Sequence, residues 1–154
     1  AILGQVMAPS LEARHALAAI RQAAQHAVGP LRGLIHHSDH GVQYTSHAYQ
    51  AWLRERGIVA SMGEVGNSYD NAYAERVIGI LKQEYGLGRT FVDEAQARYA
   101  ATEGVYLYNH ERPHLALAYA CPMAVYTGRA TAQAFTVYQH EPADAAPVGI
   151  LPSE

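Results

Sequence analysis

Short apolar stretches alternate along the chain with longer segments that are typical of helices. Residues 2–8, 34–36 and 58–62 are apolar and predict three short strands. The last of them opens with two β-branched side chains, which favour a strand. Because predicted strands and helices alternate, the pattern indicates an α/β domain with some parallel strand pairing.

Start and stop signals divide the remaining sequence into four predicted helices. Ser10, Ser46 and Asp93 are good N-cap residues. Gly57 stands where a helix that starts at Ser46 would end. The four predicted ranges are 11–28, 46–56, 71–85 and 93–109.

The third predicted helix has two distinct faces. An apolar stripe of Ala74, Val77, Ile78 and Leu81 is predicted to hold it on the sheet. The steps i, i+4, i+8 and i+11 place four other residues on one neighbouring face. These are Asn71, Glu75, Gly79 and Lys82. In the fourth helix, Tyr99, Tyr106 and Tyr108 stand at near-helical spacing and are predicted to pack in the core.

Composition narrows the class of protein. The 154 residues, 49% hydrophobic and 16% charged, exclude a disordered tail and suit one ordinary domain. We expect no membrane segment and no signal peptide. The net charge of −3 is unusual for a free-standing nucleic-acid binder, so any basic groups must be clustered or supplied by other parts of a larger assembly. The single Cys121 excludes an intramolecular disulfide, fits a reducing cytoplasm and is interpreted as a structural thiol.

Two carboxylates stand out by position. Asp39 follows a predicted strand, where open α/β sheets place their ligands, and Glu75 lies on a helix 35 intervening residues later. Two carboxylates on rigid elements can hold Mg²⁺ through hard oxygen ligands, and a metal pair can activate water or a 3′-hydroxyl against a phosphodiester. Lys82, two turns beyond Glu75, is placed to contact a phosphate.

Simpler interpretations of the same residues stay open. Asp39 can serve only as a turn residue that accepts a hydrogen bond from a backbone N–H. Glu75 and Lys82 can be solvated helix residues. Asn71 can start its helix, touch DNA or orient Glu75, and Asp70 is interpreted as an N-cap. A zinc site at His36, His37 and His40 is disfavoured, because adjacent strand residues point to opposite faces.

Several blocks of the sequence match a known family. Residues 36–46, HHSDHGVQYTS, resemble the HSDxGxQYxS block around the second acidic residue of bacterial insertion-sequence transposases with a retroviral-integrase-like core. Residues 66–75, GNSYDNAYAE, are similar to the GNxYDNAxAE block that ends in the third acidic residue. Lys82 stands where this family carries a basic residue. Residues 108–117 resemble the YNxxRPHxxL block, and residues 119–126 the closing GYxSPxxF segment.

This resemblance implies an RNase H-like fold and a DDE-class transposase that cuts and joins DNA with Mg²⁺ or Mn²⁺. It implies that Asp39 and Glu75 are catalytic metal ligands, and that the partners are transposon-end and target DNA and further copies of the chain. The predicted DNA contacts are Lys82, Asn71, Arg112 and His114. For Arg112 and His114 a second interpretation is a bond to the end of the fourth predicted helix.

The first part of the family pattern is missing. Residues 2–8 match the third strand of such a core, and no acidic residue precedes Glu12, so the first two strands and the first catalytic Asp are absent. We therefore expect an incomplete two-metal site and little activity from this chain alone. Residues 1–126 are predicted to form the partial core and residues 127–154 a partly ordered tail.

Three hypotheses follow for the function. The chain is the core of a transposase, with Asp39 and Glu75 as two of its three metal ligands. Alternatively, it is an inactive remnant that binds DNA or partner subunits, which the missing Asp favours. The least favoured hypothesis is a nuclease of the same fold that acts on RNA–DNA hybrids. The fold permits this activity, but the YNxxRPHxxL block argues for a transposase.

Overall fold

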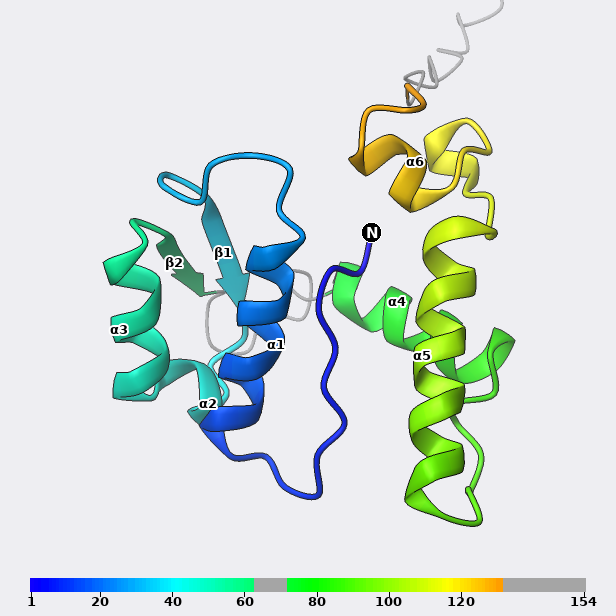
Figure 1. Ribbon diagram of the computed structural model, residues 1–154, viewed down its shortest axis with the longest axis horizontal. Helices are drawn as coiled ribbons and strands as arrows, with labels where there is room; N and C mark the ends of the chain where they lie inside the picture. The colour runs from blue at the N-terminus through cyan, green and yellow to red at the C-terminus, as the bar shows by residue number, and fades with distance from the viewer. Residues whose placement is uncertain (63–71, 132–154) are drawn as a thin grey trace, which may run out of the picture.

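The computed structural model describes residues 1–62 and 72–131. The elements in chain order are α1 (Ala13–Gln25), β1 (Ile35–Ser38), α2 (Val42–Thr45), α3 (His47–Glu55), β2 (Val59–Met62), α4 (Ala72–Glu84), α5 (Glu94–His110), the 3₁₀ turn η2 (Leu115–Leu117) and α6 (Pro122–Tyr126). Figure 1 shows two groups of elements, α1 to β2 and α4 to α6, with the N-terminal segment running between them. The α/β prediction is confirmed.

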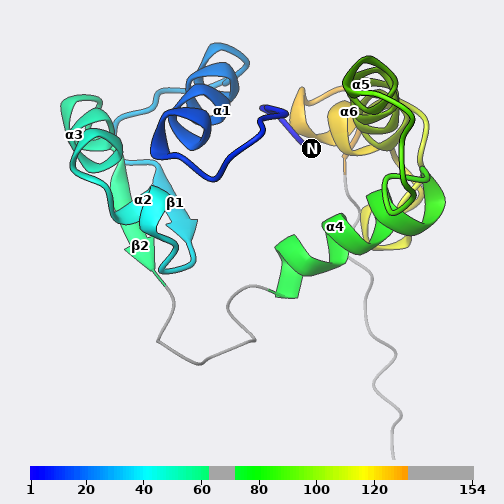
Figure 2. The ribbon, with the colours of Figure 1, turned by 90° about the horizontal axis from the view of Figure 1, so that it is seen from below.

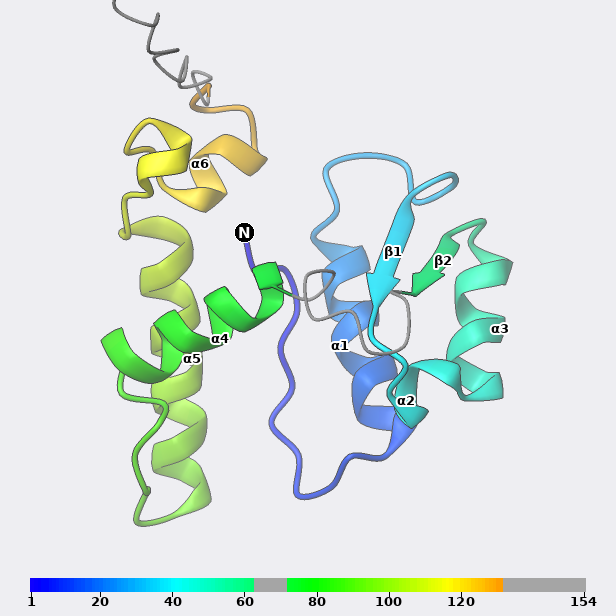
Figure 3. The same cartoon turned by 180° about the vertical axis from the view of Figure 1, so that it is seen from behind.

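β1 and β2 form a parallel two-stranded sheet. Their register pairs Ile35 with Val59 and Ser38 with Met62. The crossover between them includes α2 and α3, and α3 ends at Gly57, whose φ of +67° suits a residue without a Cβ. Figures 2 and 3 show α1 and α3 on the same face of this sheet.

The main hydrophobic core lies between α1, α3 and the sheet. Tyr49, Trp52, Leu53 and Ile58 form its buried centre, and Ile20 is among the α1 side chains that pack on them. α3 is held in place at its start by the predicted cap, because the Ser46 hydroxyl accepts a hydrogen bond from the Tyr49 N–H. The predictions of α1, α3, β1 and β2 are confirmed, with bounds shifted by a few residues. The predicted cap of α1 is wrong, because the helix begins after Glu12 and the Ser10 hydroxyl bonds to the Glu12 side chain instead.

The prediction that residues 2–8 form a strand is wrong in this structure. Within residues 1–62 and 72–131 the segment pairs with no strand, and its backbone instead bonds to side chains of two helices. The amide side chain of Asn109 on α5 binds both the N–H and the C=O of Ile2, at 2.8 and 2.7 Å. On the α1 side, the Gln22 side chain accepts from the Gln5 N–H at 2.8 Å. These contacts satisfy backbone groups that a sheet would otherwise pair.

The second group of elements is built around α5. α4 crosses α5, as Figure 3 shows, and contact is close because α5 has Gly104 at the crossing, where a Cβ would lie 3.1 Å from the Tyr85 Cβ. Ile80 is the buried residue of α4. The predicted apolar stripe is therefore wrong in part, since Ala74 and Ile78 are exposed: α4 is covered by α5 on one side only.

The aromatic residues of α5 also differ from the prediction. Tyr108 is buried as expected, but Tyr99 and Tyr106 are exposed. Tyr99 and Tyr106 are seven residues apart and share one face of the helix, whereas Tyr108 follows Tyr106 by two residues and lies on nearly the opposite face, which the rest of the protein covers. Within residues 1–62 and 72–131, no helix is both long and apolar enough to span a membrane. Most of the predicted tail, residues 132–154, lies outside the described residues.

Candidate functional site

Asp39 lies at the carboxyl end of a parallel strand, where the sequence predicted it. β1 ends at Ser38, and the exposed Asp39 opens the turn that leads into α2. Its Oδ1 accepts a hydrogen bond from the Gly41 N–H at 2.9 Å. The backbone hydrogen bond that the turn interpretation predicted is therefore present, and it orients the exposed carboxylate at the strand end, whereas the metal-ligand role of Asp39 stays a prediction.

The two histidines before Asp39 point to opposite faces of the sheet. His36 faces α3, where its Nε2 lies 3.0 Å from the Tyr49 hydroxyl. Burial, followed by the charge of neighbouring His37, lowers the pKa of His36, so this ring is neutral at pH 7. His37 instead lies 3.1 Å from the hydroxyl of Ser61, its register partner on β2. The alternation expected of adjacent strand residues is confirmed.

Glu75 lies in the first turn of α4, on a face that is open to solvent. Ala72, Tyr73, Ala74, Glu75 and Arg76 are all exposed. Farther along the same face, a Cβ on Gly79 would meet nothing within 4 Å, and Lys82 is exposed in the last turn. Glu75 and Lys82 are thus accessible to a large ligand. Asn71, the fourth residue of this predicted face, lies outside the described residues.

The chemistry of these donors suits a hard divalent cation, but the set is small. Asp39 and Glu75 offer exposed carboxylates on a strand end and a helix. In the described part of the chain, no three His, Cys, Asp or Glu side chains come together as a metal site. Asp39 and Glu75 are therefore candidate metal ligands by their chemistry, and their sharing of one metal site is a proposal.

Arg112 and His114 make contacts within the protein. The Arg112 guanidinium binds the Glu84 carboxylate with two hydrogen bonds of 2.7 Å, from Nε to Oε2 and from Nη2 to Oε1. This hydrogen bond lowers the pKa of Glu84 and raises the pKa of Arg112. The His114 ring packs edge-on against Tyr108 at 5.0 Å between centroids, and burial is the main cause of its lowered pKa. The Arg112 pair was not predicted, because the prediction looked to the end of α5 and not to α4, whereas His114 does contact the last turn of α5, at Tyr108.

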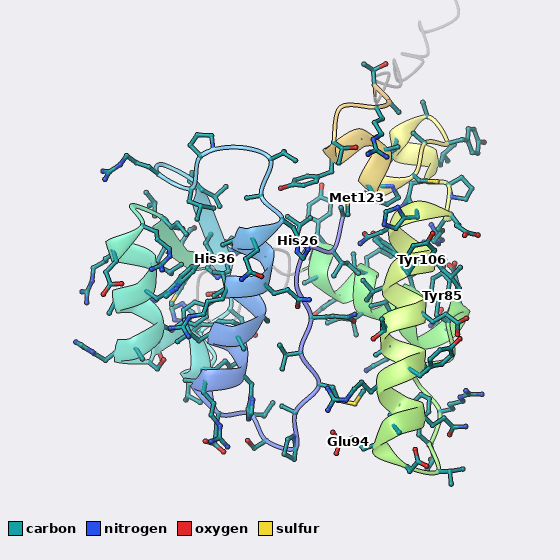
Figure 4. All side chains as sticks on the ribbon, in the orientation of Figure 1. His26, His36, Tyr85, Glu94, Tyr106 and Met123 are labelled. Atoms are coloured by element: carbon teal, nitrogen blue, oxygen red, sulfur yellow. The ribbon has the colours of Figure 1, made fainter. Side chains whose placement is uncertain are left out.

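The sequence analysis also missed the role of the Asn109 side chain, which lies in the YNxxRPHxxL block. It is buried, and it ties the N-terminal segment to α5 through both amide atoms. Beside it lies a cavity of about 380 Å³ lined by Gln22 and His26 of the α1 region and by Tyr106 and Met123 among others. Figure 4 shows Tyr106 and Met123 on the side of the helical group that faces His26. The signal in the sequence was that the amide of Asn109 directly follows Tyr108, which was predicted to pack in the core.

Two family models match this chain, and together they extend over both groups of elements. Residues 4–68 match one family model described as an integrase core domain, and residues 56–122 match a second with the same description. The matched ranges include Asp39 and Glu75. The chain belongs to the integrase core family.

Several proteins that resemble this chain are insertion-sequence transposases. It is 39% identical over 111 residues to the transposase of insertion sequence IS629 of Shigella sonnei, covering 72% of this chain and 37% of that protein. It is also 39% identical over 116 residues to a putative transposase of IS986/IS6110 from Mycobacterium tuberculosis, covering 72% of this chain and 42% of the relative. The chain therefore spans about two fifths of the length of these curated relatives.

Solved integrases share the fold. The catalytic core domain of BIV integrase superposes with a TM-score of 0.61 at 22% identity, covering 81% of this chain and 76% of that one. A simian T-cell lymphotropic virus intasome gives a TM-score of 0.64 at 16% identity, covering 95% of this chain and 46% of that one. The RNase H-like fold that the sequence motifs implied is confirmed.

Proposed function

We propose that this chain is the core of an insertion-sequence transposase that cuts and joins DNA strands, with Asp39 and Glu75 as two of its metal ligands. The observation that carries the proposal is the placement of Asp39. It follows a parallel strand, its direction is fixed by Gly41, and it stands in a sequence block typical of this family. The transposase relatives supply the reaction class.

Both carboxylates serve as metal ligands in this proposal. Asp39 directly follows the last residue of β1, and Glu75 lies in the exposed first turn of α4. Both use hard oxygen atoms, for which Mg²⁺ and Mn²⁺ are suitable partners. The bound metal ions would activate the attacking oxygen and stabilise the leaving oxygen of the phosphodiester. The third ligand is proposed to come from sequence outside the described residues.

DNA would reach this site along the open face of α4. Lys82 lies two turns beyond Glu75, at about 10 Å along the helix axis, which is within one or two phosphates of a bound strand. Asn71, which lies outside the described residues, stays a predicted DNA contact. His114 stays a predicted DNA contact, although its ring already packs on Tyr108. Arg112 was also a predicted DNA contact, but its pair with Glu84 favours a role within the protein. We propose further copies of the chain as partners in the active assembly, acting in the bacterial cytoplasm.

A cleavage assay on the intact protein, meaning this chain with the first strands of an integrase core restored, tests the proposal. A labelled duplex that carries the transposon end is incubated with Mg²⁺ or Mn²⁺, and strand nicking is measured. Asp39→Asn and Glu75→Gln are each expected to reduce nicking to the metal-free background. Glu94→Gln is the matched control, because Glu94 is also an exposed first-turn glutamate but lies on α5, and it should retain full activity. Retained nicking by either site variant would refute the proposal.

One observation favours the alternative of an inactive remnant that binds DNA or partner subunits. No three metal-ligating side chains cluster among residues 1–62 and 72–131. Under this alternative the isolated chain binds DNA without binding metal. Mg²⁺ titration of the 154-residue chain, followed through the side-chain NMR signals of Asp39 and Glu75, separates the two. Tight binding of two ions by the chain alone would contradict the remnant hypothesis.

A further inference from the structure

Among the described residues, the contacts that hold α4 lie toward its C-terminal end. Its first turn, which carries Glu75, is exposed throughout. Its contacts with the rest of the protein are concentrated in the second half, where Ile80 is buried, Glu84 binds Arg112, and Tyr85 packs on Gly104. Figure 3 shows the same arrangement, with α4 crossing α5 and its first turn projecting toward the sheet. The direction of the projecting end therefore depends on contacts at the crossing.

The Arg112–Glu84 pair is the directional contact at this crossing. Two parallel hydrogen bonds of 2.7 Å fix both the distance and the plane of the two groups, which a single apolar contact does not. The Arg112 side chain is only 20% exposed, compared with 46% for Glu84. The remaining Nη1 lies 3.4 Å from the carbonyl of Pro113, so the guanidinium is held from the loop side as well.

The helix acts as a lever on the Glu75 carboxylate. Glu75 and Glu84 are nine residues apart, so at 1.5 Å per residue they are separated by about 13 Å along the axis. A rotation of about 5° at the anchor would move Glu75 by about 1 Å. A displacement of about 1 Å at a reacting centre costs on the order of 100-fold in rate.

We propose that Arg112 is a positioning residue, which sets the orientation of Glu75 through its fork to Glu84 and the rigid body of α4. This rests on the proposed function for the role of Glu75, but the orientation of α4 is a structural property that can be measured alone. In this proposal Arg112 does not contact DNA. The experiment must therefore distinguish positioning through Glu84 from a direct contact between Arg112 and a DNA phosphate.

The orientation of α4 is measured by the distance between two spin labels. In a Cys121→Ser background, labels are placed at Tyr73→Cys on the exposed end of α4 and at Arg54→Cys on α3. Tyr73 lies eleven residues from Glu84, so a swing of about 10° would move its label by about 3 Å. Arg112→Ala and Glu84→Ala should each broaden or shift the distribution by about this amount.

Two further variants make the interpretation specific. The charge-swapped pair Arg112→Glu with Glu84→Arg should restore the narrow distribution, because the fork is rebuilt in reverse. Arg112→Lys should restore it only in part, because an ammonium cannot form the planar fork. Arg98→Ala, which removes the exposed ion pair to Glu94 on α5, is the control and should leave the distance unchanged. Thermal unfolding of each variant identifies any that do not fold.

Activity of the intact protein gives the second measurement. Arg112→Ala and Glu84→Ala should each lower the nicking rate 10- to 100-fold while the Kd for DNA changes less than twofold, and the charge swap should restore the rate. An unchanged label distance in Arg112→Ala, or a swap that restores neither quantity, overturns the proposal. So does a Glu84→Ala protein that behaves as wild type while Arg112→Ala weakens DNA binding and its salt dependence. If the protein nicks no DNA at all, the proposed function fails, whereas the label distances still decide whether Arg112 orients α4.

Discussion

Replacing Asn109 by Ala removes the two hydrogen bonds that tie the N-terminal segment to α5. The amide oxygen accepts from the Ile2 N–H at 2.8 Å, and the amide nitrogen donates to the Ile2 carbonyl at 2.7 Å. Asn109 is 4% exposed, so water cannot readily replace its side chain. The Asn109 side chain thus pairs with the backbone N–H and C=O of Ile2, as a neighbouring strand would in a sheet.

The size of the effect follows from these contacts. Each intramolecular hydrogen bond contributes about 1 kcal/mol net, and a backbone group left half-buried without a partner costs a further 1–3 kcal/mol, roughly. The expected loss of unfolding free energy for Asn109→Ala is therefore about 3–5 kcal/mol. In a domain of this size that corresponds to a fall in Tm of roughly 6–20 °C.

Urea and thermal unfolding followed by circular dichroism measure this loss. Gln22→Ala is the matched control, because it removes a single hydrogen bond to the same segment, at Gln5, and should cost about 1 kcal/mol. Asn109→Asp should be as destabilising as Asn109→Ala at pH 7, because its carboxylate places an oxygen against the Ile2 carbonyl. An Asn109→Ala protein within about 0.5 kcal/mol of wild type, the range of a surface substitution, would refute the reasoning.

Three smaller predictions concern α4 and α5. Asp93→Ala should lower the unfolding free energy by about 1 kcal/mol in urea denaturation, and Asp93→Asn should not, because the cap accepts a 2.7 Å hydrogen bond that Asn can also accept. Gly79→Ala should raise stability by about 0.5–1 kcal/mol, since its surroundings are open, whereas Gly104→Ala should gain nothing, because its methyl would lie 3.1 Å from a side-chain carbon; equal gains in Tm would contradict this. Glu84→Gln should cost less than about 1 kcal/mol at pH 7, because the pair with Arg112 is partly exposed. The hydrogen bond lowers the folded pKa of Glu84, so the cost should shrink as pH falls from the ordinary range of a glutamate carboxyl through that lowered pKa; a cost that does not change with pH in acidic urea titrations would contradict it.

The sequence predicted best those elements whose signals are local. Ser46 and Asp93 cap α3 and α5, and Gly57 ends α3, because each acts on backbone groups within a few residues. α2 and α6 were missed, since helices of four and five residues carry no periodicity and depend on tertiary packing.

Predictions that needed a distant partner were less successful. The apolar segment at residues 2–8 has the composition of a strand, but a strand requires a neighbour, and here Asn109 takes that place from 107 residues away. In the candidate site, Asp39 could be placed because a strand end is a local feature. The partner of Arg112 could not, because Glu84 lies on another helix 28 residues earlier.

The central claim is that Asp39 is a metal ligand in DNA cleavage, and a change of ligand chemistry tests it most directly. Asp39→Cys replaces a hard oxygen ligand by sulfur, which Mg²⁺ accepts poorly and the softer Mn²⁺ accepts better. The nicking rate of intact Asp39→Cys protein is compared with that of wild type in each metal. We predict that the variant is inactive with Mg²⁺ and recovers measurable nicking with Mn²⁺. Full activity with Mg²⁺ would contradict the assignment of Asp39, and so would an absence of nicking in both metals while the wild-type protein is active in both.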